Sequence, residues 1–349
     1  MALATHILRL VTALLLAIAT AASVSGQSTP TAAASAESVD GGPGPVTRFL
    51  TPADTFSPRR FWTSAGAVGA TATGFGIGLW HAWYKDYDLG AFRTFDDRGE
   101  WLAMDKLGHT YTAYHYSRWA YHALRWSGNP EGRSLAICVG VSVALQSTIE
   151  VMDGFSEQWG FSWADMGANL GGAGLFAAQQ LAFGEQRVQV KFSSWRVPYP
   201  TDPILPRDGE GPTSSVVDRA REQFGTTPWQ RFVKDYNGQT LWLSTNPWVL
   251  AGADEPRLPW LNLSFGYSAH NVLGAFGNGW RRGEEVYVPP VGFARQREYL
   301  LSLDVDLERL PVRNRALRTV LLLANHFKIP APALLFREGD PVRWRWLYY

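Results

Sequence analysis

The stretch from Trp101 to Trp126, WLAMDKLGHTYTAYHYSRWAYHALRW, contains the features from which the fold is inferred. It is rich in aromatic and small residues and has no proline, which predicts one long helix. Its first turn nevertheless carries Asp105, Lys106 and His109, an acid, a base and an imidazole. Such a turn on an otherwise apolar helix indicates either a helix cap or one wall of a polar site.

Three further helices of similar composition surround this stretch in the sequence. In the first of them small residues recur at every fourth position, at Gly66, Ala70, Gly74 and Gly78, a spacing that lets two helix backbones approach closely. Two of the three connections are short, which favours an up-and-down arrangement. We therefore expect a mainly α fold in which residues 59–187 form a Gly-rich four-helix bundle. The predicted helices cover residues 61–80, 101–126, 134–152 and 163–183.

The uncharged lengths of these helices run from the mid-teens to about twenty residues, against roughly 20 needed to span a bilayer. Such helices either cross a membrane or form a bundle that rests on one, and we expect a membrane-associated bundle. The polar face of the second helix suits lipid headgroups and plain solvent equally well. This face consists of His115, Arg118, His122 and Arg125.

The N-terminus predicts export. Arg9 precedes a largely apolar run, and small residues then lead to a cleavage position after Gly26, so residues 1–26 read as a secretory signal peptide. Residues 27–58 start with a stretch that lacks large apolar side chains, which predicts a disordered leader. We expect an exported protein of the bacterial cell envelope, in the periplasm and associated with a membrane.

Composition excludes several classes of protein. The net charge is +1, so there is no basic field suited to nucleic acid. The single cysteine, Cys138, lies in an apolar segment and is expected to be a small buried hydrophobe. It can supply neither a disulfide framework nor a lipid-anchor cysteine after the signal peptide.

Residues 188–349 differ in character and predict a smaller mixed α/β region. Residues 298–307 alternate like a strand, and we expect the acids Asp304, Asp306 and Glu308 to form a solvated strand face rather than a calcium site. The C-terminal RWRWLYY reads either as an interfacial anchor or as a packed tail. This region is also a possible binding surface for a protein partner. Further strands are predicted at residues 188–192, 239–244, 261–267 and 285–288, and helices at 215–224 and 314–327.

An up-and-down bundle brings polar residues of its helices to one end. Within each helix the pairs Asp105/His109, Glu150/Asp153 and Asp165/Asn169 are three or four residues apart and therefore share a face. Facing polar pairs of this kind build binding, metal and acid/base sites in helical bundles. The predicted binding set is Asp105, Lys106, His109, Glu150, Asp153, Ser162, Asp165 and Asn169.

Helix capping explains part of this set. Asp105 is a natural N-cap, and SWAD, Ser162 to Asp165, matches a capping box. Glu150 and Asp153 lie instead in the last turn of their helix, where the macrodipole is negative and acids are disfavoured. They need a positive partner, which could be Lys106, His109 as imidazolium, or a bound cation. A plain ion pair with Lys106 is the structural alternative to a binding site.

The motifs DKLGHTYTAY, IEVMDG and FSWADMGANLGG resemble those of the YfiM-like proteins, a family of unknown function described as predicted periplasmic lipoproteins. The same order of Asp-Lys-x-x-His, an acid, and Ser-x-x-Asp-x-x-x-Asn is also similar to the membrane-embedded VanZ-like proteins. C-terminal runs such as LPWLNLSFGYSA look like the longer envelope members of the first family. The resemblance implies an envelope location and marks the same eight residues, but it implies no established reaction.

Two functions follow as hypotheses. In the first, the bundle binds an amphiphile, such as a membrane lipid or another envelope component, or stabilises an envelope assembly through the buried Asp/Lys/His/Glu cluster. In the second, the protein is an acid/base or metal-dependent hydrolase or transferase that acts on an envelope lipid. Its catalytic candidates are His109, Lys106, Glu150 and Asp153. One divalent metal ion would then be held by His109, Glu150, Asp153 and Asp165.

Overall fold

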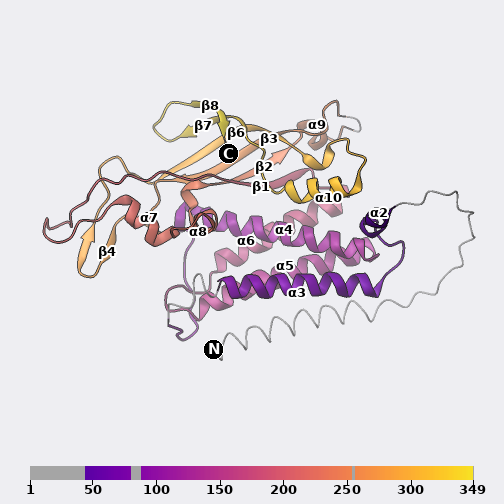
Figure 1. The fold of residues 1–349 in the computed structure, drawn as a ribbon, viewed down its shortest axis with the longest axis horizontal. Coiled ribbons are helices and arrows are strands. Elements are labelled where there is room, and N and C mark those ends of the chain that lie inside the picture. Colours follow the sequence, from indigo (N-terminus) through magenta and orange to yellow (C-terminus); the bar gives the residue numbers. More distant parts are fainter. Residues whose placement is uncertain (1–43, 80–87, 254–255, 349) are drawn as a thin grey trace, which may run out of the picture. The chain divides into compact units, whose positions relative to one another are not determined.

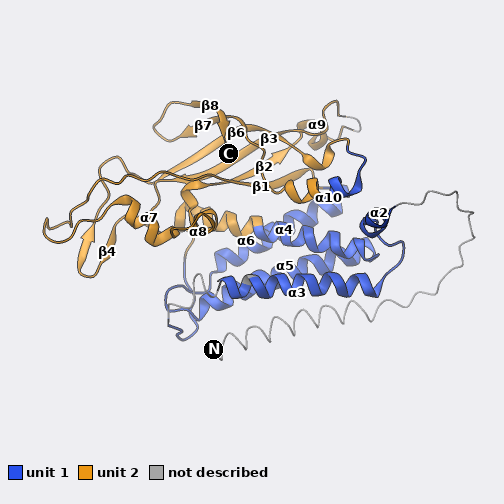
Figure 2. Ribbon diagram, viewed as in Figure 1, with its two compact units in different colours: residues 1–96, 112–185, 312–319 blue, residues 97–111, 186–311, 320–349 orange. Residues whose placement is uncertain are grey.

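The computed structural model describes residues 44–79, 88–253 and 256–348 of the 349-residue chain (Figure 1). The predicted signal peptide and the first part of the leader lie outside the described residues. The chain divides into two compact units (Figure 2). The helical unit comprises residues 1–96, 112–185 and 312–319, and the sheet unit comprises residues 97–111, 186–311 and 320–349.

The helical unit contains the long helices that the sequence predicts, followed in the chain by an antiparallel sheet. Within this unit α5 and α6 pack against each other. The arrangement of four helices as one bundle, and its contact with a membrane, stay predictions. The helices of this part are α2 (Pro45–Leu50), α3 (Pro58–Leu79), α4 (Met104–Trp126), α5 (Glu131–Gly154) and α6 (Trp163–Phe183).

Local chemistry sets the ends of these helices. The Ser162 hydroxyl accepts a hydrogen bond from the backbone N–H of Asp165 at 3.0 Å and thereby caps α6, which ends at Gly184 in a left-handed conformation. Gly128 forms the turn between α4 and α5 with a φ of +82°. A Cβ at this position would lie 2.2 Å from the carbonyl oxygen of Thr55, so only glycine fits.

The end of the expected disordered leader is ordered. It contains α2, and the backbone N–H groups of Ala53 and Ser57 bind the carbonyl oxygens of Trp126 and Ser127 at 3.1 and 2.9 Å. The expectation of disorder up to residue 58 is therefore wrong for residues 44–58. The reason is that this segment satisfies carbonyl groups that the end of α4 leaves unpaired.

The small-residue face of α3 does not pack against another helix among the described residues. A Cβ added at Gly66, Gly74 or Gly78 would meet nothing within 4 Å. The close approach that their spacing predicts is therefore wrong. Spacing identifies a smooth helix face, but the face need not be covered.

Polar residues of α4 are buried where the sequence analysis left them open to lipid headgroups or solvent. The exposed fraction is 1% for His115 and 2% for Arg118, so that reading is wrong for these two side chains. Large apolar side chains of the same unit are exposed instead, among them Trp119 at 43% and Leu170 at 55%. Cys138 is fully buried, as predicted.

The sheet unit is built on a six-stranded sheet with the order β1-β2-β3-β6-β7-β8, in which every pair of neighbours is antiparallel. A separate hairpin pairs β4 with β5. The bounds are β1 (Val188–Ser194), β2 (Gln239–Thr245), β3 (Leu261–His270), β4 (Trp280–Arg282), β5 (Glu285–Tyr287), β6 (Gln296–Val305), β7 (Ala331–Arg337) and β8 (Arg343–Tyr348). Helices α7 (Val216–Phe224), α8 (Pro228–Lys234), α9 (Pro247–Leu250) and α10 (Arg315–Ala324) connect the strands.

The acids at the end of β6 are buried, not solvated. Asp304 is 1% exposed and Asp306 2% exposed, whereas Leu301 and Leu303 on the opposite face are 37% and 48% exposed. The prediction of a solvated acidic face is therefore wrong. The alternation is real, but it is inverted, because polar side chains of several strands bond one another on the inner side of the sheet.

The first two turns of α4 belong to the core of the sheet unit. Met104 is fully buried together with Leu241, Ala269 and Val272. The 3-10 turn before α4 (Glu100–Ala103) has three residues in succession with positive φ, from Trp101 to Ala103. Hydrogen bonds hold this unusual turn, since the N–H of Trp101 binds the Ala275 carbonyl at 2.8 Å. The division between the units thus falls within α4.

Candidate functional site

The start of α4 carries a charged cluster within the sheet unit. The Lys106 ammonium lies 2.6 Å from Asp97 Oδ2 and 2.9 Å from Asp105 Oδ2. Tyr236 donates its hydroxyl hydrogen to Asp105 Oδ1 at 3.1 Å. His109 Nε2 lies 3.8 Å from the same oxygen, which is too long for a hydrogen bond but close enough for charge interaction once the ring is protonated.

Asp105 is not the N-cap of α4. It lies inside the first turn, and its carboxylate binds Lys106 and Tyr236, so the capping interpretation is wrong. Carboxylate oxygens of Asp97, Glu100 and Asp105 lie within 4.8 Å of one another and could hold a cation. The Lys106 ammonium already bonds two of these carboxylates, so this donor set fits an ion pair better than a metal site.

The helical unit holds a second polar group centred on Gln146 of α5. Its Nε2 donates to Thr112 Oγ1 of α4 at 2.7 Å and to Asn169 Oδ1 of α6 at 2.9 Å. Gln146 is 2% exposed and Asn169 is fully buried. One amide therefore ties three helices together inside the unit, and its hydrogen bonds are needed because a buried amide without them is costly.

Glu150 lies one turn further along α5 and is 1% exposed. Its Oε2 accepts a hydrogen bond from the backbone N–H of Ser162, the N-cap of α6, at 3.3 Å. From the sequence, Lys106, His109 or a cation was expected to compensate this acid. The structure adds another positive partner, the N-terminal end of α6, because a helix N-terminus carries partial positive charge.

The eight predicted site residues thus fall into two groups. Asp105, Lys106 and His109 belong to the sheet unit, as the division of the chain places them. The others belong to the helical unit, where the structure links Glu150 to Ser162, Ser162 to Asp165, and Asn169 to Gln146. Asp153, in the last turn of α5, is partly exposed. A single site that joins all eight residues stays a prediction, as does a metal held by His109, Glu150, Asp153 and Asp165. His81, which the sequence would also place at this end of the predicted bundle, lies outside the described residues.

Sequence reasoning missed four participants. Asp97 stands eight residues before Asp105 in an acidic loop, so its proximity could have been anticipated. Thr112 and Gln146 lie on the predicted faces of their helices, at i+3 from His109 and i−4 from Glu150, and could also have been found by periodicity. Tyr236 is 131 positions away from Asp105 and gives no signal in the sequence.

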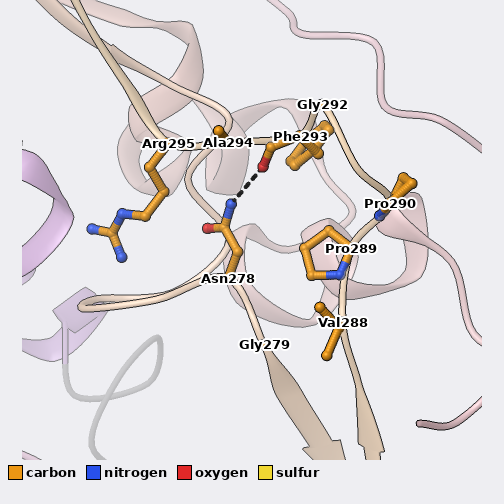
Figure 3. A pocket seen from close by; sticks show the side chains of 9 residues that line it. All are labelled: Asn278, Gly279, Val288, Pro289, Pro290, Gly292, Phe293, Ala294 and Arg295. Atoms are coloured by element: carbon orange, nitrogen blue, oxygen red, sulfur yellow. Dashed lines mark hydrogen bonds between the residues drawn. The ribbon is translucent and has the colours of Figure 1, made fainter.

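A surface pocket of the sheet unit is an alternative candidate site. It has a volume of about 430 Å³ and lies in the sheet unit beside the β4–β5 hairpin (Figure 3). Asn278 donates to the carbonyl of Phe293 at 3.0 Å, and Arg295 binds the carbonyls of Gly274 and Ala275. These polar groups are engaged in holding loops, and the pocket contains no acid or histidine among its lining residues, so it offers little chemistry.

The chain thus combines long helices, which bury polar side chains and expose apolar ones, with a C-terminal antiparallel sheet. Residues 93–180 match the model of a family described as "Predicted periplasmic lipoprotein (DUF2279)". This range contains all eight predicted site residues and supports an envelope location, but it does not reach the C-terminal runs. Comparisons with curated proteins and with solved structures each find no significant match.

The family description includes lipid anchoring, which the sequence analysis did not expect. The one cysteine of the chain, Cys138, is buried in α5, where its thiol donates to the carbonyl of Leu135. Absence of a lipid anchor has no support from the family match and stays a prediction.

Proposed function

We propose that this chain is a cell-envelope protein whose helical unit contacts a membrane and binds an amphiphile through the polar residues of α4, α5 and α6. The observation that carries the proposal is that the helical unit buries polar side chains such as Gln146 and Asn169 among its apolar core residues, while it exposes apolar side chains such as Leu170 and Leu181. In water the reverse distribution is favoured, because burial of apolar surface drives folding.

The outer surface supports contact with acyl chains. Val151, Leu170 and Leu181 are exposed by 36%, 55% and 76%. By length and composition α5 is also able to cross a membrane, and only 28% of its most apolar 18-residue window is buried. A core helix of a water-soluble protein would be mostly buried, so lipid contact explains α5 better.

The inner surface supports a polar ligand group. Thr112 of α4 accepts a hydrogen bond from Gln146 of α5, which also binds Asn169 of α6. Glu150 lies one turn beyond Gln146, and Asp165 one turn before Asn169. Carboxylates and amides at this level favour a hydroxyl- or amine-bearing headgroup, and the apolar helix faces favour its acyl chains.

The alternative proposal is a hydrolase or transferase that acts on an envelope lipid. Its support is that His109 Nε2 lies 3.8 Å from Asp105 Oδ1, since an imidazole beside a carboxylate is a common arrangement in acid/base catalysis. Metal content of protein purified without chelator, and release of product from a labelled lipid, test this version.

The binding proposal is tested with short-chain phosphatidylethanolamine as the probe and the full chain in detergent. We expect Glu150→Gln and Asn169→Leu each to weaken binding at least about tenfold, the loss that one charged or buried hydrogen bond accounts for. Thr148→Ala is the matched control on α5, since its hydroxyl binds the Ala144 carbonyl of its own helix. Unchanged affinity in both variants, with normal helical content, would contradict the proposal.

A further inference from the structure

One face of the six-stranded sheet exposes apolar side chains over its centre, although the start of α4 covers this face at Leu241 and Tyr267. One row of side chains, in register across five strands, is apolar and consists of Leu243, Phe265, Leu301, Leu334 and Trp344. Of these, Leu243, Phe265, Leu301 and Trp344 are 37–51% exposed. The neighbouring row on the other face contains Ser244, Ser264 and Ser302, none of them more than 3% exposed.

The other face is concave, and its charged side chains pair with one another beside the buried apolar cluster of Trp242, Leu300 and Leu335. The Lys191 ammonium of β1 lies 2.7 Å from the Asp304 carboxylate of β6, although β2 and β3 lie between these strands. The hydroxyls of Thr240 and Tyr348 meet at 3.2 Å across three intervening strands. The edge of β1 is covered as well, because Phe192 exchanges backbone hydrogen bonds with His326 and Lys328 at 3.0 and 2.9 Å. The sheet is therefore strongly coiled, and its apolar face is convex.

Convexity bears on what covers the exposed part of the apolar face, beyond the end at Leu241 and Tyr267 that the start of α4 covers. Two convex surfaces touch over a small area, whereas a stable protein interface buries roughly 1,200–2,000 Å². Acyl chains are fluid and follow a convex surface without loss of contact.

The border of the apolar face has the residues of a membrane interface. In β8 two exposed tryptophans, Trp344 and Trp346 at 51% and 80%, alternate with the exposed Arg343 and Arg345. Arg297 is exposed at the start of β6, which lies at the same end of the sheet as the start of β8. Tryptophan is enriched at lipid headgroup level, and arginine is attracted to anionic headgroups.

We propose that the convex face of the sheet, around Phe265 and Leu301, contacts the acyl chains of a bilayer containing anionic lipid, with the Arg/Trp border of β8 at headgroup level. This surface is distinct from the helical faces discussed above, and it assigns the lipid contact to the region that the sequence marked as a protein-binding surface. A polar interior under an apolar exterior is the pattern of strands that face lipid.

The single cysteine of the chain makes a clean test available. In a Cys138→Ala background, new cysteines replace Leu301 on the convex face, Glu284 in the exposed turn between β4 and β5, and Leu170 on α6. Each variant of the full chain carries an environment-sensitive fluorophore and is bound to vesicles of three parts phosphatidylethanolamine to one part phosphatidylglycerol, part of it brominated in the acyl chains. The bromines quench only a probe that reaches the hydrocarbon.

We expect strong quenching and a blue-shifted emission at position 301 and neither at position 284. Replacement of Arg297 and Arg345 by glutamine should weaken binding to anionic vesicles by about fivefold for each arginine. Quenching at position 170 but not at 301 overturns this inference and leaves the helical contact standing. Quenching at 301 but not at 170 supports the sheet contact and contradicts the helical contact. If the probe at 301 becomes buried as the protein concentration rises in the absence of lipid, a second copy of the chain covers the convex face. That result also contradicts the proposed lipid contact.

Discussion

The ammonium of Lys191 lies 2.7 Å from the carboxylate of Asp304, and neither side chain has any exposed surface. Further hydrogen bonds complete this pair, since Asp304 accepts from the Ser244 hydroxyl at 2.6 Å and from the Ile329 N–H at 3.1 Å. Lys191 also donates to the carbonyl of Val305. The pair therefore links strands that are not neighbours and holds the coil of the sheet.

Removal of one partner should destabilise the sheet unit strongly. Lys191→Met leaves a buried carboxylate without its counter-charge, for which we expect a loss of about 3–5 kcal/mol. The double variant Lys191→Met with Asp304→Leu should recover much of this loss, because neither charge is then buried. Urea unfolding of the full chain in detergent measures both values. Equal stability of the single and double variants would show that the ion pair is not what matters.

Alanine in the glycine face of α3 should stabilise the helical unit. Gly66 and Gly74 have open space where a Cβ would be, so Gly66→Ala and Gly74→Ala each gain about 0.5–1 kcal/mol of helix propensity. Gly128→Ala is the opposite control, because its Cβ would collide with Thr55. Thermal unfolding followed by circular dichroism measures the three changes. A lower melting temperature for the α3 variants would mean that this face packs against another helix after all.

Gln146→Leu should destabilise the helical unit by about 1–3 kcal/mol. Leucine has a similar volume but leaves Thr112 and Asn169 without the amide that binds them, and a buried polar group that loses its partner costs this amount. Thr148→Ala is the matched control on α5, since its hydroxyl binds only the Ala144 carbonyl of its own helix in the structure. If chemical unfolding shows no difference between the two variants, the hydrogen bonds of Gln146 do not stabilise the packing of the three helices.

Regular helices were predictable because capping residues next to them in the sequence mark where they begin and end. The predicted range of α6 agrees with the observed Trp163–Phe183, since the Ser162 cap and Gly184 can both be read from the sequence. Strands β7 and β8 were not predicted. Pro332 lies within β7 beside a register shift, and a proline argues against a strand. Strand β8 has large exposed side chains on both faces, so its sequence does not show the alternation of a strand with one buried face.

The polarity of the sheet could not be predicted for a different reason. A period of two residues assigns Leu301 and Asp304 to opposite faces, but it does not say which face is inside. That depends on Lys191, a residue more than a hundred positions from Asp304. The site residues could likewise be predicted only where local spacing relates them. Helical spacing places Gln146 near Glu150, whereas the contact between Tyr236 and Asp105 depends on the fold of the sheet unit.

Stability of the sheet unit should rise with pH between about 8 and 10.5 through Lys328. Burial lowers the pKa of this lysine from 10.5 to about 8, with Asp304 opposing the shift and Lys191 adding to it. The folded state thus binds fewer protons than the unfolded state in this window, so stability increases as the pH rises through it, by at most about 3 kcal/mol. Below pH 8 the folded state must bury the charged ammonium, which lies 4.6 Å from the ring of Trp242.

Lys328→Met removes this titration. We expect the variant to be more stable than the parent chain at pH 7 and to lose that advantage by pH 10, because the parent lysine is then neutral in the folded state. Urea unfolding at several pH values measures the difference, and Arg318→Met on the exposed side of α10 serves as the control. Other groups titrate in the same range, so the decisive quantity is the difference between variant and parent. A difference that stays constant from pH 7 to pH 10 would place the pKa of Lys328 outside this window.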